Sequence, residues 1–206
     1  MNSRPPSAAR RRRLVWLGVL ICLVVAVGGL LRRSPRPAPR PEVPRAQLTL
    51  RDGQLHLTGT SVPFTGIVTE HYDRGGRKSR SVVSNGLLEG LSEGWHTNGQ
   101  KQIEEHFHAG ISHGLRLKWY PSGQKLSAVL VVAGELEGPF RRWHANGTLA
   151  EEIPMKQGQP DGFSRGFYPS GCLQAEARLQ DGKMLEQHHW PDGERPSATP
   201  SPAAHP

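Results

Sequence analysis

The segment Gly90-Leu-Ser-Glu-Gly-Trp-His-Thr-Asn-Gly99 returns 24 residues further on as Gly114-Leu-Arg-Leu-Lys-Trp-Tyr-Pro-Ser-Gly123. Most of the 206-residue chain keeps this spacing. A period of this length predicts a stack of small supersecondary units, each of which buries its apolar side only against its neighbours. A fold of this kind offers a long surface rather than one deep cleft.

Glycine and aromatic residues occupy the same slots in successive units, and we expect them to hold the repeats together. These structural positions are Gly90, Gly114, Gly138 and Gly162 at the start of the unit, Gly99, Gly123, Gly147 and Gly171 at its turn, and the aromatic column Trp95, Trp119, Trp143 and Phe167. We expect the aromatic rings to pack as a ladder rather than to bind a ligand.

The dipeptide Asn98-Gly99 predicts a hairpin turn, because both residue types tolerate positive φ. Ser122-Gly123 takes its place in the next unit. The density of glycine disfavours helix, and no 3.6-residue apolar pattern survives between the glycines. The sequence therefore predicts an all-β fold, an elongated antiparallel β-meander of 24-residue hairpin repeats over residues 47–194. We expect six hairpin units, the first of them incomplete.

Side chains alternate across a strand, so residues 91, 93 and 95 share one side of the predicted sheet with the aromatic column. We expect the same side of the return strands to fill the gaps between the rings. The residues expected there are Ile103, Phe107, Val129, Val131, Ile153, Met155, Ala175, Ala177 and Leu179. An apolar side without a covering layer is a candidate surface for homodimer formation.

The opposite side of the predicted sheet gathers aromatic and cationic side chains in one row. Our candidate partner-binding residues are His96, Lys118, Tyr120, Arg142, His144 and Tyr168. Exposed rows of this composition are typical of interaction surfaces. The alternative is a solvated side of the sheet whose histidines and tyrosines merely suit β geometry.

The pattern Gly-x4-Trp-x-x-Asn/Ser-Gly-x10-Gly resembles MORN repeats, and more closely the variant class found in bacterial toxin–antitoxin antitoxins. The resemblance covers roughly residues 47–194. The first unit departs from the pattern, with His71 in the aromatic slot, and the last unit is two residues shorter. The resemblance implies an elongated β-meander used for protein or lipid contacts. Its antitoxin branch implies binding to a toxin.

The N-terminal segments have a different composition. Residues 1–13 are basic, and residues 14–31 are 18 uncharged, largely apolar residues, a length at the lower edge of a membrane-spanning helix. We expect a transmembrane signal-anchor there. Residues 32–46 form a Pro/Arg-rich linker that favours extended polyproline II. Residues 195–206 are rich in Pro, Ala and Ser, and we expect a disordered tail.

The anchor predicts a single-pass membrane protein with its repeats on the non-cytoplasmic side. The alternative is a cleaved signal peptide, with Ala26 and Gly28 as the small residues beside the cut, which would release the repeats as a secreted protein. Arginines flank the apolar segment on both sides, so charge asymmetry alone does not fix the orientation.

The net charge of +8 is concentrated at the N-terminus. Residues 1–45 hold 10 of the 26 basic residues and one of the 18 acidic ones, which leaves 16 basic and 17 acidic residues in the rest of the chain. A nearly neutral repeat region lacks the basic footprint of phosphate-backbone binding. We therefore expect no nucleic-acid partner.

One strand carries Glu104, His106 and His108 at alternating positions, so these side chains share one side and have the chemistry of zinc ligands. The corresponding slots of other repeats hold no such set, and an open sheet provides no cleft. We expect no metal, no cofactor and no catalytic residue.

Together these features predict a non-enzymatic, membrane-anchored repeat protein that presents an extended β-surface to a protein partner of unknown identity. One alternative is an antitoxin-like protein that binds and neutralises a cognate toxin. Another is a scaffold that contacts membrane lipid, for which the arginines of the linker are the only support.

Overall fold

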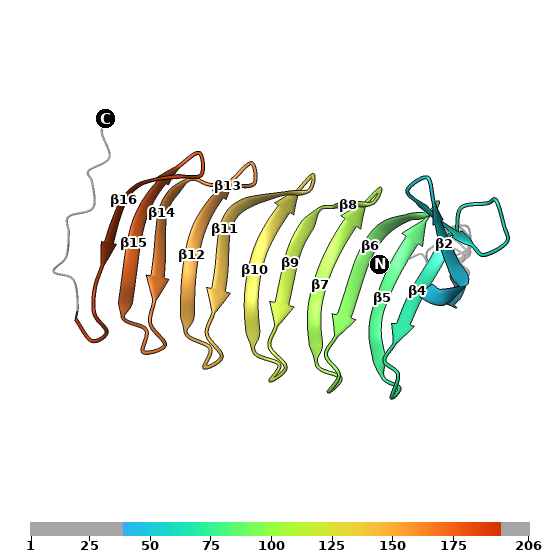
Figure 1. The fold of residues 1–206 in the computed structure, drawn as a ribbon, viewed down its shortest axis with the longest axis horizontal. Helices are drawn as coiled ribbons and strands as arrows, with labels where there is room; N and C mark the ends of the chain where they lie inside the picture. The colour runs from blue at the N-terminus through green and yellow to red at the C-terminus, as the bar shows by residue number, and fades with distance from the viewer. Residues whose placement is uncertain (1–38, 195–206) are drawn as a thin grey trace, which may run out of the picture. The chain divides into compact units, whose positions relative to one another are not determined.

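The computed structural model describes residues 39–194, and within them the fold is all-β. Fourteen strands form one long sheet, in which strands that follow one another in the chain mostly lie side by side (Figure 1). The predicted antiparallel meander is therefore confirmed. No helix among these residues has the length and hydropathy that a membrane crossing requires. The predicted anchor at residues 14–31 lies outside the described residues.

The order of strands in the sheet is β1-β4-β5-β6-β7-β9-β10-β11-β12-β14-β15-β16, and β2 and β3 form a separate hairpin. The elements are β1 Glu42–Pro44, a 3-10 turn Arg45–Gln47, β2 Leu48–Arg51, β3 Gln54–Leu57, β4 Gly66–His71, β5 Arg77–Ser84, β6 Leu87–Trp95, β7 Lys101–His108, β8 Ile111–Ser112, β9 Gly114–Trp119, β10 Lys125–Val132, β11 Glu135–Trp143, β12 Leu149–Lys156, β13 Gln159–Pro160, β14 Gly162–Phe167, β15 Leu173–Gln180 and β16 Lys183–His189.

Two kinds of turn alternate along the ribbon. At the turns that follow the aromatic column, the Gly99 N–H donates to the His96 carbonyl at 2.9 Å, and Gly99 has φ of 84°. At the other end of the hairpins, a two-residue turn such as Ala109-Gly110 has positive φ at both residues, the geometry that matches the twist of the flanking strands. The hairpins predicted from Asn-Gly and Ser-Gly are confirmed.

The prediction of which return-strand residues share a side with the aromatic column is wrong, because each hairpin of the repeats contains a β-bulge. Gly94 lies opposite Ile103, whereas Trp95 lies opposite Lys101, so the return strand holds one extra residue, Gln102. A shift of one residue moves a side chain to the other side of the sheet. Ile103 and its counterparts therefore lie on the side away from the aromatic column.

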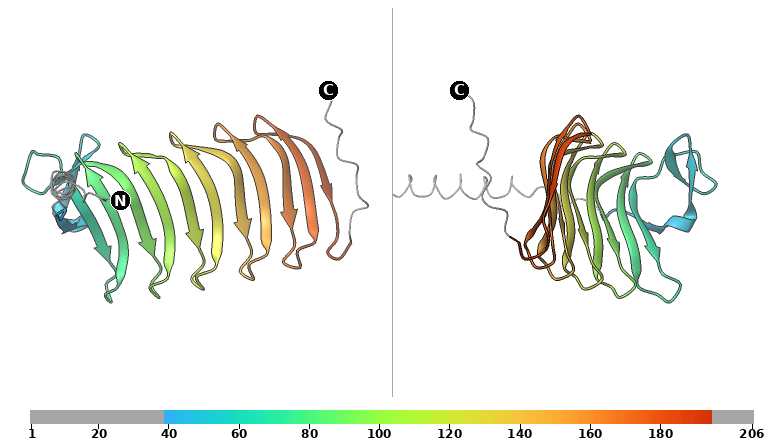
Figure 2. Two further views of the ribbon diagram at one scale, coloured as in Figure 1. Left: turned by 180° about the vertical axis from the view of Figure 1, so that it is seen from behind. Right: turned by 60° about the vertical axis from the view of Figure 1, so that its left-hand side comes forward.

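We name the two sides by their residues. The tryptophan face carries Trp95, Trp119, Trp143 and Phe167. The valine face carries Ile103, Val129, Val131 and Ile153. The same register recurs along the ribbon, where Phe140 lies opposite Ile153 and Ser164 opposite Ala177. Val131 is fully buried and Val129 is 4% exposed, so the valine face holds the interior of the repeats. The strands bend along their length, as the two views of Figure 2 show.

The N-terminal end of the ribbon is covered by a small hydrophobic cap. Its buried residues Leu48, Phe64, Val68 and Val83 pack against partly buried Val43, Leu55, Leu57 and Leu88. The hairpin β2–β3 is tied to the first turn of the sheet by the Leu55 N–H, which donates to the Gly86 carbonyl at 2.8 Å. The short strand β1 pairs in parallel with β4 and covers its edge.

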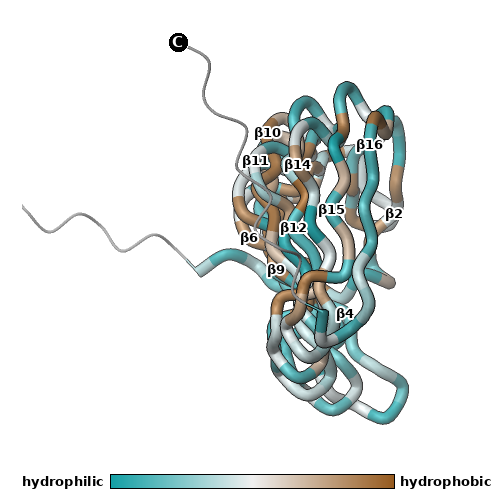
Figure 3. The backbone as a smooth tube through the Cα atoms, turned by 90° about the vertical axis from the view of Figure 1, so that its left-hand side faces the viewer, coloured by the Kyte–Doolittle hydropathy of each residue, from teal (hydrophilic) through white to brown (hydrophobic). Residues whose placement is uncertain are grey.

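The C-terminal end is different. Every residue of β16 is exposed, and β16 is the last strand of the sheet within residues 39–194. Seen along the ribbon from this end, hydrophobic segments concentrate in the upper half of the cross-section and the lower turns are mostly hydrophilic (Figure 3). The ribbon thus has one covered end and one open end.

Candidate interaction surface

The histidines and tyrosines of the predicted partner-binding row form a ladder of hydrogen bonds between repeats, to which Tyr72, outside the predicted row, adds one more bond. Each ring reaches the backbone carbonyl of the aromatic residue in the following unit. The bonds are Tyr72 Oη to Trp95 O at 2.6 Å, His96 Nε2 to Trp119 O at 2.9 Å, Tyr120 Oη to Trp143 O at 2.9 Å, His144 Nε2 to Phe167 O at 2.8 Å, and Tyr168 Oη to Trp190 O at 3.1 Å. All five rings are half-buried.

This ladder gives the row a structural role that the sequence analysis did not foresee. The polar atom of each ring bonds to a backbone carbonyl of the neighbouring unit and so satisfies part of that carbonyl's hydrogen-bonding capacity. The two histidines donate through Nε2, which fixes their tautomer when they are neutral. A partner-binding role for His96, Tyr120, His144 and Tyr168 stays a prediction, and their replacement would also remove contacts between repeats.

The two cations of the predicted row lie on the valine face and are exposed. Lys118 lies opposite Ser127. Arg142 forms an ion pair with Glu151, with Nε to Oε1 at 2.7 Å. The hydrogen bonds to this carboxylate raise the pKa of Arg142. Of the two, Lys118 is therefore the cation that is more available to a partner.

Cations lie over the rings of the tryptophan face. The Arg77 guanidinium is 5.6 Å from the centre of the Trp95 ring, and Lys125 Nζ is 5.2 Å from the centre of the Trp143 ring. In each case the cation belongs to the return strand that precedes the ring. Such contacts contribute about 0.5–1 kcal/mol at exposed sites. These contacts link consecutive repeats, as the hydrogen bonds of the ladder also do.

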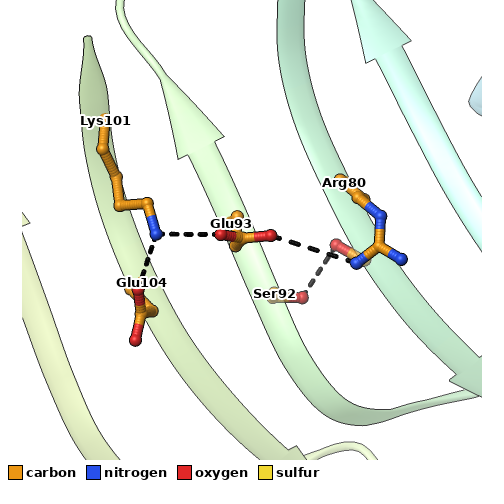
Figure 4. Close-up of polar contacts among 6 residues, drawn as sticks. Arg80, Ser92, Glu93, Lys101 and Glu104 are labelled. Atoms are coloured by element: carbon orange, nitrogen blue, oxygen red, sulfur yellow. Dashed lines mark hydrogen bonds and ion pairs between the residues drawn. The ribbon is translucent and has the colours of Figure 1, made fainter.

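A row of ion pairs crosses the middle of the tryptophan face near its N-terminal end. Glu93 Oε1 lies 2.9 Å from Lys101 Nζ, and its Oε2 lies 3.9 Å from Arg80 Nη1. Lys101 also reaches Glu104 at 2.7 Å (Figure 4). The hydrogen bonds from Lys101 to Glu104 and then to Glu93 raise the pKa of the lysine. In Figure 4 the hydroxyl of Ser92 points to the opposite side of the sheet, where it bonds to Ser81.

The same row continues in the C-terminal half of the ribbon. Arg141 pairs with Glu152 at 2.5 Å, and Arg165 pairs with Glu176 at 2.8 Å. Glu152 in turn lies opposite Arg165 in the sheet register. Charges of opposite sign therefore alternate across these strands, an arrangement that favours the native register.

The hairpin β9–β10 interrupts this row. Its residues in the row are Leu117 and Ala128, which lie opposite one another. Leu117 also lies opposite Glu104, and Ala128 lies opposite Arg141, so an apolar strip separates the two charged regions. The charge row of the tryptophan face is thus continuous except at this hairpin.

The interruption widens into a surface of exposed aliphatic side chains, which we name the apolar stripe. It consists of Ile111, Leu115, Leu117, Leu130 and Val132. Four of these are large and exposed, at 53% for Ile111, 49% for Leu115, 44% for Leu130 and 41% for Val132. Leu115 lies directly opposite Leu130, so the stripe is contiguous. Contiguous apolar surface rimmed by polar residues marks sites of interaction.

The candidate metal ligands do not converge. Glu104 is bound by Lys101, and His108 Nδ1 lies 3.1 Å from Glu89 Oε1. The pKa of Glu89 is lowered by the backbone N–H of Ala109 and then by His108. Among the residues that the structure describes, no group of three or more His, Cys, Asp or Glu side chains is placed to hold a metal ion.

A protein-family model described as MORN repeat variant matches residues 88–109 and 136–157. The chain carries variant MORN repeats. The two matched MORN units are 48 residues apart, and both contain the sequence Trp-His-x-Asn-Gly. The MORN unit between them has Trp-Tyr-Pro-Ser-Gly instead. In the structure the two forms of the turn are in contact. Asn98 Nδ2 donates to the Pro121 carbonyl of the next turn at 2.7 Å, and Asn146 Nδ2 donates to the Pro169 carbonyl in the same way.

No curated protein matches the MORN chain. One solved structure that does match is described as "Crystal Structure of TarM", with 8% sequence identity and a TM-score of 0.31. The match covers 48% of the MORN chain and 19% of the TarM chain. We take nothing about fold or function from a similarity of this size.

Two features of the site were readable in the sequence in principle. The slot that contains Glu93, Arg141 and Arg165 holds Leu117 in the third MORN unit, and this exception marks the apolar stripe. The alternation of His and Tyr after the aromatic column marks the ladder. The sequence analysis missed the apolar stripe and the ladder because it did not include the β-bulge, which decides which return-strand residues share a side with the aromatic column.

Proposed function

We propose that this MORN-repeat protein is a non-enzymatic scaffold that binds a protein partner through the tryptophan face, with the apolar stripe as the centre of the contact. The observation that carries the proposal is the exposure of Leu115, Leu130 and Val132 on the repeat hairpin that interrupts the charge row, and of Ile111 in the short strand β8 just before it. Interfaces commonly have an apolar centre and a polar rim.

The ion pairs on both sides of the stripe support a rim of this kind. Glu104 is neutralised by Lys101 on one side, and Arg141 is neutralised by Glu152 on the other. A partner with an apolar ridge and uncharged or mixed-charge flanks would fit, because neither flank leaves an uncompensated charge to bury. The exposed Lys118 lies on the valine face and would be outside this contact.

The membrane part of the proposal rests on the sequence. The uncharged segment 14–31 would anchor the protein, and the Pro/Arg-rich linker would hold the repeats away from the bilayer. The non-enzymatic part is supported by the chemistry of the surface. The carboxylates Glu93 and Glu152 of the charge row are engaged in ion pairs, and histidines such as His96 are engaged in the ladder. These arrangements suit structure and recognition.

A double variant of the stripe, Leu115→Ser with Leu130→Ser, tests the proposal. Both side chains are nearly half exposed, so the repeats should still fold, whereas binding should weaken at least tenfold, equivalent to about 1.4 kcal/mol. The full chain would be used to capture partners from the native host, and each captured protein would be purified for titration calorimetry against both forms.

The matched control is Leu50→Ser with Val62→Ser, which removes two exposed aliphatic side chains from the N-terminal cap, where they are 60% and 70% exposed. This control should bind as the unaltered protein does. Equal affinity of all three forms for every captured protein would contradict the proposal. Self-association that the stripe variant alone abolishes would assign the stripe to a second copy of the chain.

A further inference from the structure

Within residues 39–194, the last strand of the ribbon, β16, has an edge that pairs with no other strand. The Trp190 N–H donates to the Gln174 carbonyl at 2.9 Å, on the β15 side. Hydrogen-bonding directions alternate along an antiparallel strand, so His188 and Glu186 also bond toward β15. The backbone N–H and C=O groups of Gln187 and His189 therefore point outward from the sheet. Such an edge is a template for the addition of another strand.

The opposite edge of the sheet is not available in this way. β1 covers β4 over Ile67, Val68 and Thr69, and the Ile67 N–H donates to the Pro41 carbonyl at 2.8 Å. β1 itself is only three residues long and ends in Pro44, which has no N–H to donate. A copy that added its β16 to this end would have to displace β1.

We propose that β16 pairs with β16 of a second copy of this chain, in antiparallel orientation, so that the meander continues across a twofold axis at Gln187. With one edge open and the other covered, pairing joins two open ends. Head-to-tail pairing would give an open filament, whereas pairing of identical edges closes at a dimer. The central pair would be Gln187 with Gln187 of the second copy, and each would donate its outward N–H to the other.

The charges of β16 fit this register. With the axis at Gln187, Glu186 of each copy lies opposite His188 of the other. Both residues lie on the tryptophan face, because they are the partners of Arg178 and Glu176 in β15. Within one chain, His188 Nε2 already lies 2.9 Å from Glu186 Oε1. Pairing would therefore produce a cluster of two carboxylates and two imidazoles, in which each carboxylate has two imidazole neighbours.

An exposed apolar residue near the start of β16 favours the same arrangement. Leu185 is 55% exposed. In the proposed register Leu185 lies beside His189 of the second copy, whose ring would cover it. Burial of Leu185 in each copy adds an apolar contribution to the backbone pairing.

Cysteine cross-linking of the full-length chain in detergent tests the register. In a background with Cys22→Ala and Cys172→Ala, the variant Gln187→Cys places two thiols across the axis, at a Cα separation of about 5.5 Å that a disulfide can span. We expect a cross-linked dimer on mild oxidation. The matched control is Lys183→Cys, also on β16, which would lie opposite residue 191 of the second copy and should stay monomeric. Equal cross-linking of the two variants would overturn the proposed register.

Two further variants test the pairing itself by light scattering. Gln187→Pro removes the central outward donor, which has no partner within the described chain, and should weaken dimer formation at least tenfold. Glu186→Arg should also weaken it, and Glu186→Arg with His188→Glu should restore it. An unaltered chain that is monomeric at all concentrations would overturn the proposal. A dimer that survives Gln187→Pro but is lost with Leu115→Ser and Leu130→Ser would also overturn it and would place the contact on the apolar stripe.

Discussion

The two ends of the ribbon differ in whether the end strand of the sheet is covered. At the N-terminal end, β1 and the hairpin β2–β3 enclose a small core around Leu48, Phe64 and Val83. At the C-terminal end, β16 is exposed along its whole length. The repeats between them are nearly uniform in register, so the difference arises from the segments that flank the array.

This difference separates the end that contributes to the stability of the fold from the end that is exposed for association. A repeat array derives its stability from contacts between neighbouring units, and an end unit lacks one neighbour. The cap supplies the missing neighbour at one end. Changes near the cap should therefore affect stability strongly, whereas changes near β16 should affect association. The following predictions compare matched positions at the two ends.

The largest effect is expected from the core of the cap. Phe64 is 5% exposed, and Phe64→Ala should lower the free energy of unfolding by roughly 3–5 kcal/mol through lost burial and a cavity. The control Met184→Ala, at a side chain that is 59% exposed, should change it by less than about 0.5 kcal/mol. Denaturant titration followed by tryptophan fluorescence measures both. Similar losses in the two variants would remove the asymmetry between the ends.

A pair of glycines in equivalent turns gives the second comparison. Gly86 and Gly182 have φ of 78° and 75°, so alanine is strained at both. A Cβ at Gly86 would also lie 2.7 Å from Gln54 Cβ in the cap, whereas at Gly182 the nearest atom is the flexible Gln159 Oε1 at 3.4 Å. Gly86→Ala should cost about 2–4 kcal/mol and Gly182→Ala about 1 kcal/mol. Thermal unfolding measures both, and an equal decrease in melting temperature for the two variants would show that the cap rearranges to accommodate the added methyl group.

The hydrogen-bond ladder provides a smaller contrast. Tyr120→Phe removes a bond in the middle of the ribbon, and Tyr168→Phe removes one next to the open end. Each should cost roughly 0.5–1.5 kcal/mol. Hydrogen exchange should quicken in β11 and its neighbours for Tyr120→Phe, but only in β15 and β16 for Tyr168→Phe. Faster exchange in the cap from either variant would indicate coupling along the whole ribbon.

The smallest change in stability is expected from the deprotonation of Lys101 in the charge row at high pH. The pKa of Lys101 is raised above its ordinary value of 10.5 by Glu104 and Glu93. A raised pKa in the folded state means that the lysine stabilises the fold fully below pH 10.5 and loses this contribution as the pH rises through the folded-state pKa. The loss should stay below about 1 kcal/mol because the pair is partly solvated.

Lys101→Met should abolish this part of the pH dependence, which denaturant titrations between neutral and alkaline pH would show. Arg165→Met is the matched control near the open end, because its guanidinium forms an ion pair with Glu176 but does not titrate in this range. If the unaltered protein and Lys101→Met responded identically to alkaline pH, Lys101 would have no part in the stability of the row.

The repeat architecture was predictable because its signals are local. A glycine such as Gly99 at a turn, an alternating strand and an aromatic residue every 24 positions each describe a few consecutive residues. The candidate surface was only partly predictable. Lys118 and Arg142 were expected to share an exposed row with the histidines and tyrosines; both cations are exposed, but they lie on the valine face, which also holds the buried Val129 and Val131. The bonds from Tyr120 and His144 to the next repeat could not be foreseen, because they join residues 23 positions apart through a bulge.

The amino-acid sequence determined the period, the turns and the antiparallel meander, since these follow from backbone preferences that act within one hairpin. Only the tertiary structure decided which aliphatic residues are buried on the valine face and which are exposed on the tryptophan face, because one extra residue per return strand moves every following side chain to the other face. Tertiary contacts also decided that one end of the ribbon is covered and the other is open, since the cap joins Leu48, Phe64 and Val83 across more than thirty residues of chain.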